Sequence, residues 1–270
     1  MLECVVNVSE GRDLAVLARL DAACGDNLLD RHSDPNHHRS VYTLVGEDAP
    51  RRLARAAVDL LTIGRHDGEH PRLGVVDVVP FVPLGDSSMD DARRARDEFA
   101  WWAAHELDVP VFVYGPAGTE ETQLPDIRRS AWIERGPDLG PSTPHPTAGA
   151  MCVGVRDVLV AYNVWLRGPL DRSMLVAIAN EVRRDGIRTL PLVLDGRPQV
   201  SMNLVDPLRV GPDRAYDAVR SACNEVGVTI DRAELVGLAT RVVIDRIDAT
   251  RWFELDVSLD RTIEARLERA

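Results

Sequence analysis

The chain has 270 residues, 45% hydrophobic and 28% charged, a composition typical of a folded globular protein with one or two domains. Acidic residues outnumber basic ones by 43 to 32, and the formal charge of −11 argues against nucleic acid or an anionic membrane as the main partner. The sequence contains no lysine, which excludes a P-loop lysine, a Schiff-base lysine and lysine-dependent pyridoxal chemistry.

The cysteines and the first residues indicate a cellular compartment. Four widely spaced cysteines, without CxxC or metal-ligand spacing, fit buried thiols in a reducing compartment better than disulfides. The start, Met1-Leu2-Glu3-Cys4, lacks the positive region of a signal peptide, and no apolar run approaches the ~18 residues of a membrane helix. We therefore expect a soluble, cytoplasmic protein.

The first half of the chain predicts the order β-α-β-β-α-β. Its strands are expected at residues 2–8, 28–30, 40–45 and 75–82, and its helices at 13–24 and 50–63. This is the split βαβ order of ferredoxin-like folds, a four-stranded antiparallel sheet with helices on one face. A long helix at 90–107 and a short strand at 109–114 extend this half.

The second half repeats that order after a long segment, residues 115–149, which reads as a functional loop or a linker. Strands are expected at 158–166, 189–194, 199–204 and 234–238, and helices at 171–184 and 212–226. The fold class is thus α/β (α+β), with two ferredoxin-like subdomains at residues 1–150 and 151–270. We expect a ligand cleft between them.

Polar residues concentrate in the segment 65–77. Asp77 lies within an otherwise apolar strand, and because a buried carboxylate needs a partner, His70 or Arg72 is expected beside it. An imidazole held by an acid is a common general base near neutral pH. The alternative for this segment is an ordinary polar surface loop.

Two groups of histidines are spaced closely enough to suggest metal ligands, yet neither group predicts a metal site. His66 and His70 stand four apart, but Gly68 and Pro71 break any helix between them. His32, His37 and His38 lack a spaced fourth ligand and fit a polar loop. We expect no metal.

The segment from His66 to Gly74, with 77–83 after it, resembles the signature of the glutamate formiminotransferase family. Six other stretches match that family in order: 6–11, 34–43, 137–141, 160–164, 199–204 and 234–238. The resemblance covers residues 1 to about 240.

The resemblance implies paired ferredoxin-like subdomains with a folate site between them and no metal. It implies transfer of a formimino group from N-formimino-glutamate to tetrahydrofolate, the co-substrate, in histidine degradation, by a cytoplasmic homodimer. His70 corresponds to the family's catalytic residue. The family's folate-contacting loop corresponds to the segment from Gly140 to Gly149, which includes Pro141 and Ser142.

Both substrates carry carboxylates, so an acidic protein must gather arginines at its site. Arg39, Arg72 and Arg156 are the candidates, and the alternative for each is a structural ion pair. Amide side chains on predicted strands could bind the pterin or tie strands together: Asn7, Asn163, Gln199 and Asn203. Glu69 and Asp77 complete the predicted binding residues.

The sequence departs from the family at several positions. His38 stands in place of the usual Asn, Leu44 in place of Phe, and Trp165 in place of Asn. The segment after Ile127-Arg128 is shorter, and no cyclodeaminase region follows, so a cyclodeaminase partner would be a separate chain. Two alternatives therefore stay open: a formyl or formimino transferase with another amino-acid donor, and a non-catalytic folate-binding protein.

Overall fold

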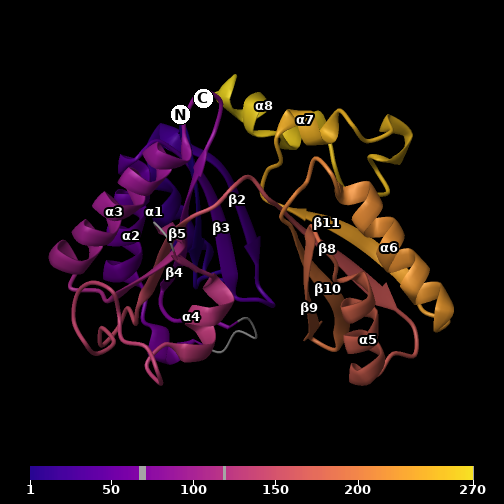
Figure 1. The fold of residues 1–270 in the computed structure, drawn as a ribbon, viewed down its shortest axis with the longest axis horizontal. Helices are drawn as coiled ribbons and strands as arrows, with labels where there is room; N and C mark the ends of the chain where they lie inside the picture. The colour runs from indigo at the N-terminus through magenta and orange to yellow at the C-terminus, as the bar shows by residue number, and fades with distance from the viewer. Residues whose placement is uncertain (67–70, 118–119, 270) are drawn as a thin grey trace. The chain divides into compact units, whose positions relative to one another are not determined.

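The chain folds into two compact units, Met1–Asp157 and Val158–Ala270 (Figure 1). The structure is a computed structural model that describes residues 1–66, 71–117 and 120–269. Each unit has its own sheet and its own hydrophobic core. The fold class is therefore mixed α/β with two subdomains, as predicted.

The first unit contains the expected β-α-β-β-α-β order. Its elements are β1 (Leu2–Val8), α1 (Leu14–Cys24), β2 (Leu28–Asp34), β3 (Arg39–Val45), α2 (Asp48–Leu60) and β4 (Val76–Pro83). The four strands lie in the antiparallel order β2-β3-β1-β4, so the predicted split βαβ order is confirmed. Short 3-10 turns follow α1 (Gly25–Asn27) and α2 (Ile63–Arg65).

Further elements widen this sheet beyond β4. They are α3 (Met89–Glu106), β5 (Val111–Ala117), β6 (Glu120–Thr122), α4 (Leu124–Ser130) and β7 (Met151–Val155). The strand β7 lies between β4 and β5 and is parallel to both, while the short β6 forms the edge. Because β7 belongs to the first sheet, the two units divide after Asp157 rather than after residue 150.

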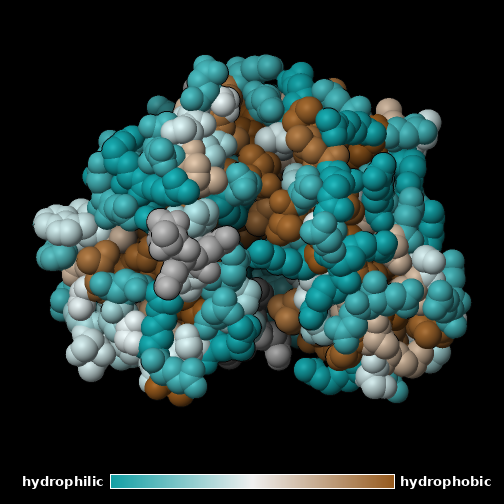
Figure 2. Space-filling view, in the orientation of Figure 1, coloured by the Kyte–Doolittle hydropathy of each residue, from teal (hydrophilic) through white to brown (hydrophobic). Residues whose placement is uncertain are grey.

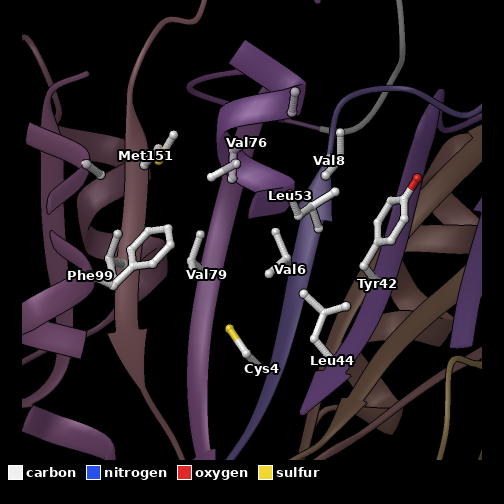
Figure 3. Close-up of a cluster of buried hydrophobic side chains, with 14 of the residues drawn as sticks. Cys4, Val6, Val8, Tyr42, Leu44, Leu53, Val76, Val79, Phe99 and Met151 are labelled. Atoms are coloured by element: carbon white, nitrogen blue, oxygen red, sulfur yellow. The ribbon is translucent and has the colours of Figure 1, made fainter. Parts of the chain in front are cut away.

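The main core of the first unit lies between one face of the sheet and the helices α1, α2 and α3 (Figure 1). Alternate residues of β1, such as Val6 and Val8, point to this side, and they meet Tyr42 of β3 and Leu53 of α2 (Figure 3). On the far side of β4, Phe99 of α3 closes the cluster. Since strand side chains alternate, every second residue of these strands is left for the opposite face.

That opposite face is partly covered by α4. Ile127 of this helix and Ala131, which directly follows it, pack with Val78, Phe112 and Cys152 in a smaller apolar cluster. The segment 115–149 is therefore not one continuous loop, as the sequence suggested. It includes β6 and α4, whose few residues give too short a pattern to be recognised.

The second unit repeats the same topology. Its elements are β8 (Val160–Arg167), α5 (Arg172–Val182), β9 (Ile187–Leu194), β10 (Arg197–Leu204), α6 (Pro212–Glu225) and β11 (Thr229–Val236). The strands lie in the antiparallel order β11-β8-β10-β9, and α5 and α6 cover one face. The tail adds α7 (Arg241–Ile244), 3-10 turns at Ala249–Arg251 and Leu259–Arg261, and α8 (Ile263–Leu267).

Most residues visible in the space-filling view are hydrophilic, with smaller apolar patches (Figure 2). Across the part of the chain that the structure describes, no helix combines the length and hydropathy needed to cross a membrane.

Candidate functional site

A fully buried carboxylate, Asp77 of β4, is the centre of a charged cluster in the first unit. Its Oδ2 accepts hydrogen bonds from Nη1 of Arg39 and from Nη2 of Arg128, each at 2.6 Å. Its Oδ1 accepts one from the backbone N–H of Leu73 at 2.8 Å. Asp77 thus joins β3, α4 and the segment before β4.

The charges of this cluster decide its protonation. Burial alone raises the pKa of Asp77, but the cations Arg39 and Arg128 outweigh it and hold that pKa well below its usual range. Burial lowers the pKa of Arg39. Burial also acts to lower the pKa of Arg128, but the attraction of Asp77 is stronger and raises that pKa overall. Since guanidinium groups keep their proton in proteins, the carboxylate is ionised between two cations at neutral pH.

Strand register brings these side chains together. Asn7 of β1 and Arg39 of β3 lie on the face opposite Val6 and Tyr42, and Nε of Arg39 donates to Oδ1 of Asn7 at 3.1 Å. The helix α4 supplies Arg128, and the packing of its neighbour Ile127 in the apolar cluster beneath α4 fixes that helix. The structure therefore places together three predicted residues, Asn7, Arg39 and Asp77.

Of the two partners expected for Asp77, Arg72 binds elsewhere, and His70 lies outside the described residues. The carboxylate is bound by Arg39 and Arg128, whereas Arg72 donates to the backbone carbonyls of His37 and His38 at 3.1 and 3.2 Å. Arg128 was missed. The one sequence signal for Arg128 was its position directly before the segment that is shorter than in the family. A buried acid needs a cation, but this rule does not say which cation supplies the charge.

Arg72 belongs to a second group, formed with His66 and the turn between β2 and β3. Its Nη1 lies 2.5 Å from Nε2 of His66, and the rings of His38 and His66 lie 4.2 Å apart. Nε2 of His66 also lies 2.9 Å from the carbonyl oxygen of His38, so this ring nitrogen faces both a donor and an acceptor. Arg72, His66 and the turn between β2 and β3 thus form one hydrogen-bonded group.

Glycines allow the backbone segments around Asp77 to approach closely. Gly149 has φ +74°, and a Cβ there would overlap the carbonyl oxygen of Leu73. A Cβ on Gly74 would overlap the backbone of Ala148 and Ala150. These contacts hold the residues before β4 in place, including the N–H that binds Asp77.

The other predicted loop residues lie near the end of α3. Gly140 has φ +85°, and a Cβ there would stand 3.2 Å from Cβ of Ala104. Pro141 is half-buried and Ser142 is exposed. Arg156 directly follows the last residue of β7, and its side chain donates to the carbonyl of Asp157. It is therefore not part of the Asp77 cluster. Glu69 and His70 lie outside the described residues.

In the second unit the predicted amides lie on the sheet face opposite α5 and α6. Asn163 is buried, and its Nδ2 donates to Oε2 of Glu234 at 3.2 Å. Nε1 of Trp165 donates to the same oxygen at 2.9 Å. Gln199 is buried and Asn203 is exposed. Glu234 and Trp165 are site candidates that sequence reasoning did not select.

Within the described ranges, no three or more histidine, cysteine, aspartate or glutamate side chains lie together in a group that could hold a metal ion. The four cysteines are all buried, and burial raises the pKa of each thiol. The donors that remain prominent at the site are guanidinium and imidazole groups, which suit anionic substrates and proton transfer.

Comparison with known proteins defines the class. Residues 1–156 match the formiminotransferase domain, N-terminal subdomain. Glutamate formimidoyltransferase of Streptococcus pyogenes serotype M1 is 33% identical over 91% of this chain and 91% of its own length. The protein of the same name from Thermoplasma acidophilum is 33% identical over 94% and 92%.

A two-function relative matches only in part. Formimidoyltransferase-cyclodeaminase of Sus scrofa is 32% identical over 88% of this chain but 50% of its own length. The near full-length matches show that the protein is homologous to transferase enzymes. The chain belongs to the formiminotransferase family.

Proposed function

We propose that the protein is a glutamate formimidoyltransferase, a folate-dependent transferase that moves a formimino group from N-formimino-L-glutamate to tetrahydrofolate. The observation that carries this proposal is the match to two proteins named glutamate formimidoyltransferase over more than nine-tenths of both chains. Tetrahydrofolate is the co-substrate, and the products are 5-formimino-tetrahydrofolate and glutamate.

The reaction needs a group that moves protons. A ring nitrogen of tetrahydrofolate attacks the amidine carbon and loses a proton, while the departing amine of glutamate gains one. His70 is proposed to do both in turn, a contribution of about 10²–10⁴-fold in rate. Its neighbours in sequence support this role, because Arg72 fixes His66 and the turn at 37–38, and Asp77 fixes Leu73.

Arginines and amides are proposed to bind the two substrates. Arg39 lies in the Asp77 cluster beside Asn7, and Gly149 holds the adjoining backbone. Asn163 and Asn203 are proposed to contribute from the second unit. The ligand position between the units, the homodimer and the cytoplasmic location stay predictions.

A donor other than N-formimino-glutamate is the second candidate. It is favoured by the shortened segment after Arg128, where α4 ends at Ser130 and Arg135 pairs with Asp138 at 2.8 Å. Since Arg128 itself binds Asp77, a change next to it lies close to the proposed site.

An absorbance assay with tetrahydrofolate and a panel of formimino and formyl amino acids tests both candidates. The proposal expects the highest kcat/KM with N-formimino-L-glutamate; a higher value with another donor identifies the second candidate. A melting curve adds a reading that needs no turnover. Tetrahydrofolate at a hundredfold excess over Kd stabilises the fold by about 2.7 kcal/mol, and no shift at millimolar ligand contradicts folate binding.

A further inference from the structure

The cluster around Asp77 has more positive than negative groups. Two guanidinium groups, Arg39 and Arg128, share one carboxylate, which leaves one positive charge in excess among the described partners. The nearby Cys152 does not supply a thiolate, because burial raises its pKa. Asp77 and Arg39 are deeply buried, with 0% and 9% of their side-chain surface exposed. An excess charge beside buried groups is costly unless an anion meets it.

Arg128 is the member of the cluster that a ligand can reach. Its side chain is 18% exposed, twice the fraction of Arg39. Its two Nη atoms face Asp77, at 2.6 Å from Oδ2 and 3.4 Å from Oδ1. The described residues place no acceptor on its Nε, so the guanidinium keeps an N–H beyond those that face Asp77.

The cluster also fixes the direction of Arg128. Asp77 is held by Arg39 and by the Leu73 N–H, and Ile127 beside Arg128 is fully buried in the apolar cluster beneath α4. A charged group whose position is set before the ligand arrives loses little conformational freedom on binding. Guanidinium groups bind carboxylates with strong, charge-assisted hydrogen bonds.

We propose that Arg128 binds a carboxylate of a substrate and thereby sets substrate specificity. This inference rests on the proposed function, and it names the chemistry that the site recognises. Two sources have the required group: the amino-acid donor and the glutamyl tail of the folate. The carboxylate meets the excess positive charge of the Arg39–Asp77–Arg128 cluster.

Arg128→Gln and Arg128→Lys test the proposal, with Arg129→Gln as the matched control. Arg129 follows Arg128 on the same helix, but its side chain is 72% exposed and pairs with Asp126 at the surface, an interaction worth little. Arg128→Gln is expected to raise one substrate's KM about 10- to 100-fold, the range for losing a hydrogen bond to a charged group. Arg128→Lys keeps the charge and is expected to recover part of that loss.

Substrates without the carboxylate identify its source. If the donor supplies it, the wild type loses affinity for the α- or γ-amide of N-formimino-glutamate, and Arg128→Gln changes the KM of that amide less than twofold. If folate supplies it, the same pattern appears with tetrahydropteroate, which has no glutamyl tail. An equal effect of Arg128→Gln on every substrate overturns the proposal in favour of a structural role.

A binding measurement separates this proposal from the proposed function. Glutarate, a dicarboxylate without reactive groups, is titrated calorimetrically into wild type, Arg128→Gln and Arg129→Gln. Weaker binding only in Arg128→Gln supports the carboxylate site even if no donor is turned over. Unchanged glutarate affinity together with an unchanged KM for both substrates overturns it, even if the wild type is an active transferase.

Discussion

Arg72 and His66 contact each other, with Nη1 of the arginine 2.5 Å from Nε2 of the histidine, and they stand on either side of residues 67–70 in the sequence. Arg72 also donates to the carbonyls of His37 and His38. One planar guanidinium therefore ties both flanks of the segment that holds His70 to the turn between β2 and β3.

Arg72→Lys should destabilise the fold. A lysine ammonium cannot reproduce the fork that reaches two carbonyl oxygens and an imidazole, so the free energy of unfolding should fall by about 1–3 kcal/mol in urea denaturation. Arg129→Lys, at an exposed position, serves as the control. A rise in KM with unchanged kcat and unchanged stability would instead show that Arg72 grips a substrate carboxylate, as its sequence context suggested.

Asp77→Asn should remove the counter-charge of Arg39 and Arg128. Breaking a buried ion pair in this way costs about 3–5 kcal/mol at neutral pH. The folded pKa of Asp77 lies below its unfolded value of about 3.9, so its stabilisation is present above pH 4 and is lost as the pH falls through the folded pKa.

The stability gap between wild type and Asp77→Asn should therefore be constant from about pH 5 to pH 8 and narrow below about pH 4. Urea denaturation at several pH values measures it. Asp97→Asn is the control, since its carboxylate is 62% exposed. A gap that widens on acidification would contradict the ion-pair account.

Gly149→Ala should displace the backbone beside the site. The left-handed conformation at φ +74° costs a residue with a Cβ about 1–3 kcal/mol, and overlap with the Leu73 carbonyl adds to that loss. Hydrogen exchange of the Leu73 amide should become faster as its bond to Asp77 is disturbed. Gly136→Ala, where a Cβ meets nothing within 4 Å, should leave stability and exchange unchanged.

His70→Ala tests the proposed proton transfer. Loss of a general acid–base group should lower kcat by about 10²–10⁴-fold, while the Kd for tetrahydrofolate changes much less. Steady-state kinetics and equilibrium binding measure the two effects separately. His105→Ala, on the exposed surface of α3, is the histidine control. An unchanged kcat with any accepted donor would refute this mechanism.

Local patterns in the sequence were sufficient for most of the fold. Asp13 caps α1 by accepting from Ala15 N and Val16 N, and Gly25 ends that helix at φ +60°. Such signals act between residues close in the chain, so the sequence alone predicted the elements and the repeated β-α-β-β-α-β order. The apolar strand around Asp77 likewise showed in advance that a carboxylate would be buried.

Only the tertiary structure decided which distant groups meet. The five residues of β7 follow a long irregular segment, and their place between β4 and β5 depends on parallel pairing that no local pattern encodes. The same holds for Arg128, 51 positions from Asp77 in the chain. The sequence determined that Asp77 needs a positive partner, because burying an unpaired carboxylate is costly. The packing of α4 against the sheet determined that Arg128 is one of the two arginines that bind it, because the strength of an ion pair depends on the distance in space and not on the separation in the chain.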